Sequence, residues 1–268
     1  MELPTRRLGK NGPTVPVLGF GAWPIGGGLG RVERSQAIET VRAAIDAGIT
    51  LIDTAEGYRS SEVILGEALA GGWRERCFLA TKASSDYSPE GIRRAAEESL
   101  RKLRTDRLDL YQIHGWNPVY PIEASMEEMS RLHAEGKILN IGVSNFLPEH
   151  MERASKVCGF ISNQVRYSLL FREIEEDGTL SFCERFGIGI LVHSPLAKGL
   201  LTGRYAASST FSADDERSQF PDFQGERFAR HLAVGRRLEG IAGALGISLV
   251  QLAIAWTLAR PIVACALV

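Results

Sequence analysis

The sequence has no long apolar run, no cluster of basic residues and no closely spaced pair of cysteines. No apolar stretch approaches the roughly 20 residues that span a bilayer. The N-terminal MELPTRRLGKNG also lacks the apolar segment of a signal peptide. Lys and Arg number 31 against 32 Asp and Glu, so the formal net charge is -1. Because phosphate binding rests on clustered Lys and Arg, this balance argues against a nucleic-acid partner. We expect a cytoplasmic protein with no membrane partner.

The four cysteines are scattered along the chain, at Cys77, Cys158, Cys183 and Cys265. They form no CxxC pair and show no metal-ligand spacing. Free thiols in a reducing compartment are therefore expected, and no metal site is expected.

Short apolar runs alternate with helical patterns along most of the chain. One such step is CFLATKA (77–83) followed by SPEGIRRAAEESLRKL (88–103), where Ser88 and Pro89 form a helix-start signature. In an earlier step, Ser35 is a candidate cap for the helix 35–48. About eight such steps occur, and their strands are apolar throughout, which is typical of a parallel sheet buried on both faces. Residues 1–268 are therefore predicted to form a single (β/α)₈ barrel domain.

A doubly wound open sheet is the rival fold, and it would usually carry G-x-G-x-x-G after its first strand when it binds a dinucleotide. The segment GGGLGR (26–31) does not fit, because Arg31 stands at the third glycine position, and a flexible loop explains it better. The Asn-Gly at 11–12 predicts an N-terminal β-hairpin that closes one barrel end. The polar loop 206–226 has two open interpretations, an excursion over the barrel mouth or a tolerated insertion.

Polar residues recur at the carboxyl ends of the apolar strands, where the catalytic groups of a barrel gather. In chain order they are Asp53, Lys82, His114, Ser144, Asn145, Gln164 and Ser194. Taken singly, each has a structural explanation such as a helix cap or a satisfied core residue. Lysine is rarely buried without a partner, however, and an acid stands on the neighbouring strand. We therefore predict that Asp53 holds Lys82 and that Tyr58 uses the resulting cation.

These segments resemble the signature segments of the aldo-keto reductases. The resemblance runs in order over nearly the whole chain, through DTAEGY, ATK, QIHGW, GVSNF, NQVRYSLL and HSPLAKGLLTG. It implies a (β/α)₈ barrel, a nicotinamide dinucleotide cofactor, usually NADPH with NADH possible, and a small carbonyl substrate. It implies the catalytic tetrad Asp53, Tyr58, Lys82 and His114. The cofactor-binding residues that it implies are Ser144, Asn145 and Gln164 at the nicotinamide carboxamide, and Ser194, Leu196 and Gly199 along the pyrophosphate. Trp23 and Trp116 resemble substrate-pocket aromatics of the family, although both could equally be packing residues.

The residue types suit the reduction of a carbonyl, which requires a hydride donor and a proton donor. A free phenol has a pKa of about 10, and a nearby cation can lower it by about 1–3 units, so Lys82 is expected to activate Tyr58. Asp53 keeps Lys82 charged in a partly desolvated site. His114 can donate a second hydrogen bond to the developing oxyanion.

The chain departs from the family pattern at two points. His193 stands where many members carry a tyrosine that stacks on the nicotinamide, and an imidazole offers less stacking area. The sequence ends at VACALV, where the family normally continues with a loop and a helix that hold the 2′-phosphate and adenine of NADP. The last outer helix of the barrel is therefore expected to be missing, and NADPH is expected to bind weakly with little preference over NADH.

The leading hypothesis is an NADP(H)-dependent reductase of aldehydes or ketones. The alternative is a cofactor-sensing regulatory or binding protein of the same fold with little turnover. A poorly active remnant of a reductase is a third interpretation. The residues do not indicate which carbonyl compound is reduced, nor an oligomeric state.

Overall fold

A computed structural model describes residues 3–268 and contains a closed barrel of eight parallel strands, as predicted. Around the barrel the strand order is β10-β3-β4-β5-β6-β7-β8-β9, so each strand pairs with its neighbour in sequence and β10 closes against β3. The strand bounds are β3 Leu18–Gly21, β4 Leu51–Asp53, β5 Phe78–Ala83, β6 Leu110–Ile113, β7 Ile141–Ser144, β8 Ser162–Arg166, β9 Gly189–His193 and β10 Val263–Leu267.

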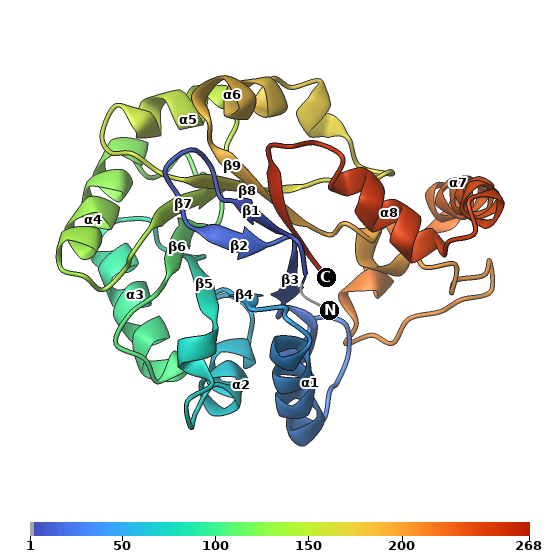
Figure 1. The fold of residues 1–268 in the computed structure, drawn as a ribbon, viewed down its shortest axis with the longest axis horizontal. Helices are drawn as coiled ribbons and strands as arrows, with labels where there is room; N and C mark the ends of the chain where they lie inside the picture. The colour runs from blue at the N-terminus through green and yellow to red at the C-terminus, as the bar shows by residue number, and fades with distance from the viewer. Residues whose placement is uncertain (1–2) are drawn as a thin grey trace.

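A short hairpin closes the amino-terminal end of the barrel, which also confirms the sequence prediction. It consists of β1 (Thr5–Arg7) and β2 (Thr14–Pro16), paired antiparallel. In the connecting turn, the backbone N–H of Lys10 donates to the carbonyl of Gly187 at 2.8 Å, close to the start of β9. Figure 1 shows the hairpin in front of the strands, so the opposite, carboxyl-terminal end is left open for a site.

Helices surround the strands and bury their apolar faces against them (Figure 1). Their bounds are α1 Arg34–Asp46, α2 Ser61–Ala68, α3 Pro89–Leu103, α4 Ile122–Ala134, α5 Pro148–Ser155, α6 Thr179–Phe186, α7 Gly225–Ala244 and α8 Leu249–Thr257. Helix α7 lies outermost and packs on α8. Within residues 3–268 no single helix is long and apolar enough to cross a membrane, and α7 and α8 meet that test only as a pair bent by 93°.

Two predicted helix starts have different outcomes. The Oγ of Ser88 accepts a hydrogen bond from the N–H of Gly91 at 3.1 Å, and Pro89 is the first residue of α3, as its sequence signature predicts. The predicted cap at Ser35 is wrong, because α1 begins one residue earlier and Glu33 occupies the cap position. The cap is the residue at which the chain passes from the preceding loop into the helix, and Ser35 already lies inside the first turn.

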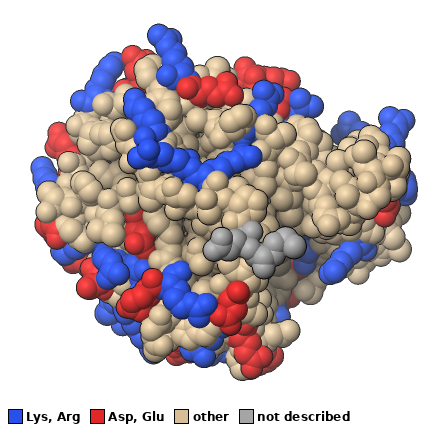
Figure 2. Space-filling model, in the orientation of Figure 1, with Lys and Arg blue, Asp and Glu red and all other residues tan. Residues whose placement is uncertain are grey.

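The strands are buried on both faces, so two apolar layers form. Inside the barrel, Leu51, Ala80, Leu110, Leu191 and Cys265 pack against residues of the hairpin. The larger layer lies between the strands and the helices. The outer surface carries both signs of charge, and Figure 2 shows Lys and Arg beside Asp and Glu around the rim of the hairpin face.

Candidate active site

A cavity of about 700 Å³ opens at the carboxyl-terminal end of the barrel strands. A volume of this size lies within the usual range for small-molecule and cofactor sites. Of the residues that the sequence suggested, the cavity lining contains Trp23, Asp53, Tyr58, His114, Asn145, Gln164, His193, Ser194, Leu196 and Gly199. Residues that are far apart in sequence therefore meet at one face, because the strand ends converge there.

Asp53 and Lys82 form an ion pair at the floor of the cavity, where Asp53 belongs to the lining and Lys82 does not. Asp53 ends β4 and Lys82 is the fifth residue of β5, and the two strands are neighbours in the barrel. The Nζ of Lys82 donates to Oδ1 of Asp53 at 2.6 Å and to the carbonyl of Thr54 at 2.8 Å. Burial is the largest single effect on the pKa of Lys82 and would lower it, but the charge and hydrogen bond of Asp53, together with those of Tyr58, outweigh burial, and the net pKa is raised. Lys82 is therefore a cation at neutral pH.

Two glutamines hold the other carboxylate oxygen of Asp53. Gln164 in β8 donates its Nε2–H to Oδ2 at 2.8 Å, and Gln112 in β6 donates to the same oxygen at 3.3 Å. The Nε2 of Gln164, a residue that the family resemblance assigns to the nicotinamide carboxamide, thus already donates to Asp53. Gln112 was not among the predicted site residues, although a glutamine within the apolar strand RLDLYQIH indicates a buried polar group.

Tyr58 lies above this pair, in the loop that follows β4. The centre of its ring is 5.0 Å from Nζ of Lys82, 4.9 Å from the ring of Trp23 and 5.5 Å from the ring of His114. Burial raises the pKa of the Tyr58 hydroxyl, and the charge of Lys82 lowers it by less, so the net pKa is raised. The expected net decrease in this pKa is therefore wrong, because desolvation of the phenolate outweighs the single nearby cation.

His114 follows β6 directly and is neutral at physiological pH. Burial, together with the nearby charge of Lys82, lowers its pKa to about 3. Its Nδ1 lies 2.8 Å from Oγ of Ser84, a residue that sequence reasoning did not single out. A neutral imidazole still has one N–H to donate.

Ser144 and Asn145 extend from the end of β7. Ser144 is buried, and its Oγ donates to the carbonyl of Gln164 at 2.9 Å, so it supports the site from behind. Asn145 has a left-handed backbone, with φ of 56°, and its Nδ2 donates to the carbonyl of His114 at 3.1 Å. Its Oδ1 lies 3.3 Å from Nε2 of His193. Asn145 thus links the ends of three strands beside the cavity.

The segment after β9 forms a tight, left-handed turn along the cavity wall. Ser194, Ala197, Lys198 and Gly199 all have positive φ values, between 49° and 99°. Gly199 is required here, because a Cβ atom would lie 2.3 Å from Oη of Tyr205. His193 ends β9, immediately before this turn. Its pKa is lowered to about 3, mainly by burial, so its ring is also neutral.

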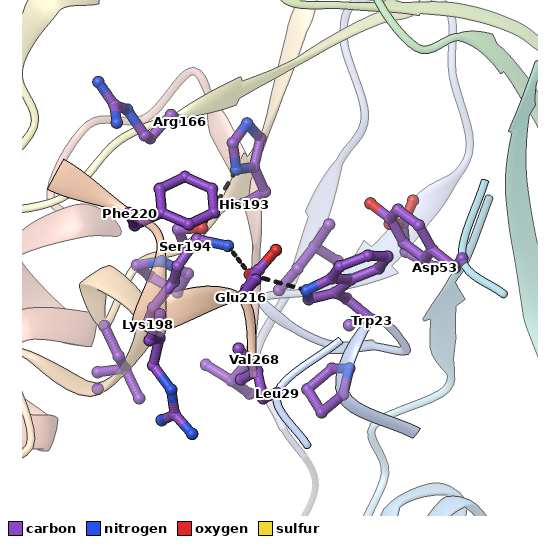
Figure 3. A pocket seen from close by; sticks show the side chains of 18 of the residues that line it. Trp23, Leu29, Asp53, Arg166, His193, Ser194, Lys198, Glu216, Phe220 and Val268 are labelled. Atoms are coloured by element: carbon purple, nitrogen blue, oxygen red, sulfur yellow. Dashed lines mark hydrogen bonds and ion pairs between the residues drawn. The ribbon is translucent and has the colours of Figure 1, made fainter. Parts of the chain in front are cut away.

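The loop 206–226 crosses the mouth of the barrel, which favours the first of its two interpretations. Asp215 pairs with Leu29, and the N–H of Glu216 donates to the carbonyl of Gly28 at 3.2 Å. The Oε1 of Glu216 accepts the Nε1–H of Trp23 at 2.8 Å and also pairs with Lys198. Figure 3 shows Glu216 between Trp23 and Lys198. The loop therefore joins the β3 and β9 sides of the cavity.

Trp116 lies elsewhere. It lines a separate, much smaller hollow beside Tyr87 and Phe146, and its ring stacks on His150 with 4.2 Å between centroids. The described residues that line the large cavity do not include it. This position does not support the substrate-pocket role that the resemblance implies for Trp116, and it favours the packing interpretation.

The lining of the cavity suits an anionic dinucleotide. It contains four cationic side chains, Arg166, Lys198, Arg204 and Arg217, beside the left-handed turn of the β9 segment. Arg204 is exposed and forms no salt bridge with the described part of the chain. Cationic side chains suit phosphate groups, because charge-assisted hydrogen bonds are about twice as strong as neutral ones. The lining also contains the carboxamides of Asn145 and Gln164 and the imidazole of His193.

Comparison with known proteins identifies the family and supports the assignment of the fold. A family model described as the Aldo/keto reductase family matches residues 17–268. The aldo-keto reductase YhdN of Bacillus subtilis is 40% identical over 258 residues, covering 91% of this chain and 78% of that protein. The fission yeast (Schizosaccharomyces pombe) aldo-keto reductase yakc [NADP(+)] is 34% identical, covering 97% of this chain and 81% of that protein.

Solved structures give the same result. The glycerol dehydrogenase of Gluconobacter oxydans matches with a TM-score of 0.87 and 35% identity, covering 98% of this chain and 85% of that one. An aldo/keto reductase of Klebsiella pneumoniae, solved in complex with NADP and acetate, matches with a TM-score of 0.76 and 32% identity, covering 97% of this chain and 83% of that one.

Proposed function

This chain belongs to the aldo/keto reductase family, and we propose that it is an NADP(H)-dependent oxidoreductase that reduces small aldehydes or ketones to alcohols. The proposal rests on one observation above all. Tyr58 lines the cavity with the buried ammonium of Lys82 5.0 Å from its ring centre. A phenol beside a fixed cation is a proton donor for a carbonyl oxygen, because the cation stabilises the phenolate that remains.

The proton transfer follows from the charges of the site. With its pKa raised by burial, Tyr58 keeps its proton on Oη at neutral pH and has it available for the carbonyl oxygen. Lys82 limits the energy of the phenolate that forms, and Asp53 keeps Lys82 charged and aimed. The neutral ring of His114 adds a hydrogen bond to the same oxygen. When bound, the reduced nicotinamide supplies the hydride for the carbonyl carbon.

The cofactor we assign is NADPH, with NADH possible. Asn145, Gln164 and the turn at Ser194, Leu196 and Gly199 are the residues that we expect to hold it, with Ser144 supporting Gln164. In this assignment Lys198 and Arg204 bind its phosphate groups. The NADP named for the yeast relative and for the Klebsiella structure supports this choice. We assign the reaction to the cytoplasm, where the four unpaired cysteines of the described chain would stay reduced.

Trp23 is the aromatic residue that we assign to the substrate pocket. It lies in the cavity lining at the edge of the Tyr58 ring and is held by its hydrogen bond to Glu216. A planar, apolar indole face beside the proton donor suits an aliphatic or aromatic carbonyl compound.

A titration with NADPH and NADH, followed by a panel of aldehydes and ketones, tests the proposal. We expect saturable binding and loss of NADPH absorbance that depends on the carbonyl compound. Tyr58→Phe is the control for turnover by this site. Tight binding of NADPH with no turnover of any compound would instead favour the alternative, a cofactor-sensing regulatory protein of the same fold.

A further inference from the structure

The two ring nitrogens of His114 have different surroundings. The Nδ1 lies 2.8 Å from Oγ of Ser84. The Nε2 has no hydrogen-bond partner within residues 3–268, and the ring lines the large cavity. In a neutral imidazole one nitrogen carries the proton and the other accepts, and the partner of one nitrogen decides the state of the other. The direction of the hydrogen bond between Ser84 and Nδ1 therefore decides whether Nε2 can donate into the cavity.

The hydroxyl of Ser84 has a second neighbour that limits its role. The backbone N–H of Gly57 donates to Oγ of Ser84 at 3.3 Å, so one lone pair of this oxygen is in use. Among the described residues, Nδ1 of His114 is the one acceptor within hydrogen-bond distance of Oγ. A proton on Nδ1 would therefore leave the hydroxyl hydrogen of Ser84 without an acceptor among residues 3–268. Donation from Ser84 to Nδ1 satisfies both groups.

The backbone around Ser84 is fixed from two further sides. Its N–H donates to Oε2 of Glu56 at 2.8 Å, and Oε1 of the same carboxylate accepts from Oγ of Ser85 at 3.0 Å. The N–H of His114 donates to the carbonyl of Ala83 at 3.0 Å, immediately before Ser84. The hydroxyl and the imidazole are thus carried by adjacent strand ends, and their separation depends on main-chain contacts.

We propose that Ser84 is a positioning residue, which donates to Nδ1 of His114 and thereby holds this histidine as the Nε2–H tautomer that faces the substrate. The inference rests on the proposed function for its catalytic consequence, but the tautomer itself is a property of the protein without cofactor. Burial and the charge of Lys82 lower the pKa of His114 to about 3, so its ring is neutral at working pH. Only one of its two nitrogens therefore carries a proton.

Nitrogen NMR of the cofactor-free protein labelled at histidine tests the tautomer directly. The chain has five histidines, and His114→Asn identifies the signals of His114. We expect a protonated Nε2 and an unprotonated, hydrogen-bonded Nδ1 in the wild type. Ser84→Ala should shift both signals toward a mixture of tautomers, whereas Ser84→Thr, which keeps a hydroxyl, should retain the wild-type pattern.

Ser85→Ala is the matched control, because it removes a hydroxyl one residue away that contacts Glu56. It should leave the signals of His114 unchanged. In turnover assays kcat should fall about two- to tenfold in Ser84→Ala, the worth of one hydrogen bond, with little change in Ser84→Thr. A wild-type spectrum with the proton on Nδ1, or one that Ser84→Ala leaves unchanged, overturns the proposal. The expected spectra in a protein with no turnover support the tautomer assignment and count against the proposed function alone.

Discussion

The ammonium of Lys82 lies 2.6 Å from Oδ1 of Asp53, and the exposed fractions of the two side chains are 0% and 3%. Oδ2 of the same carboxylate accepts from Gln112 and Gln164, so the negative charge has partners from three other strands. Isolated charges in such a place are costly, and a buried pair compensates each charge only while both partners are present. The pair therefore links the stability of the barrel to the chemistry of Tyr58.

Removing one member of the pair should destabilise the fold more than removing both charges. We expect Lys82→Met to lower the free energy of unfolding by roughly 3–5 kcal/mol, because Asp53 would be left as an uncompensated buried charge. The double variant Asp53→Asn/Lys82→Met should recover much of this loss, since a neutral amide can still accept from the glutamines. Denaturant unfolding of the four proteins of this cycle measures the coupling. Additive effects would contradict it.

Tyr58→Phe should lower kcat for carbonyl reduction by about 10²–10⁴-fold, the usual contribution of general acid catalysis. The dissociation constant for NADPH should change little, because the hydroxyl acts mainly in the transition state. The matched control is Tyr111→Phe, which removes a buried hydroxyl whose hydrogen bond goes to the carbonyl of Ile92 in α3. Steady-state kinetics and cofactor titration of both variants give the comparison. Near wild-type kcat in Tyr58→Phe would remove this residue from its assigned role.

Glu62→Gln should stabilise the protein at pH 7 to 8. Glu62 is 2% exposed, and its Oε1 accepts from Thr81 at 2.8 Å. Its Oε2 has no hydrogen-bond partner among residues 3–268, and its ion pair with Lys102 is long, at 3.9 Å. Burial raises the pKa of this carboxyl, so the native protein loses stability as the pH rises from the unfolded value of about 4.5 through the raised one. An amide keeps the bond to Thr81 without the charge.

The gain should be about 1 kcal/mol in the free energy of unfolding, because the buried charge of the carboxylate, whose Oε2 has no hydrogen bond, is removed. It should shrink below about pH 4.5, where the carboxyl is protonated in both states. Glu67→Gln is the control on the same helix. Arg34 lowers the pKa of Glu67 through a side-chain hydrogen bond, so that substitution should give no gain. A loss of stability in Glu62→Gln would contradict the prediction.

His114 and His193 should make the fold sensitive to acid. Both have pKa values lowered to about 3, mainly by burial, against about 6.5 in the unfolded chain. Between these values the unfolded state binds more protons, so stability falls as the pH drops from about 6.5 to 3. Each residue contributes at most about 1.4 kcal/mol per pH unit. Unfolding measured over this range should give a smaller slope for His193→Gln than for the wild type, and equal slopes would contradict the assignment.

The barrel and the outline of its site could be predicted because both follow from local patterns. Apolar strands such as CFLATKA, each followed by a helical pattern, require burial on two faces, which a closed parallel sheet supplies. Asp53 and Lys82 were predicted to meet because the carboxyl ends of neighbouring strands converge. Tyr58 could be assigned to the same place from its position in the loop after Asp53.

Other properties depended on contacts that no local pattern encodes. Gln112 and Gln164 are 59 and 111 residues from Asp53, and their hydrogen bonds exist only because the closed barrel brings these side chains to one carboxylate. Trp116 packs against His150 and does not line the large cavity. Glu216 contacts Trp23 and thereby holds a polar loop over the mouth of that cavity. The direction of the Tyr58 pKa shift also required the structure, because it is the balance between desolvation and one cation, and both terms depend on burial and distance. Sequence alone determined the fold and the polar residues at the strand ends, whereas tertiary packing decided which of them face the cavity, their partners and their protonation.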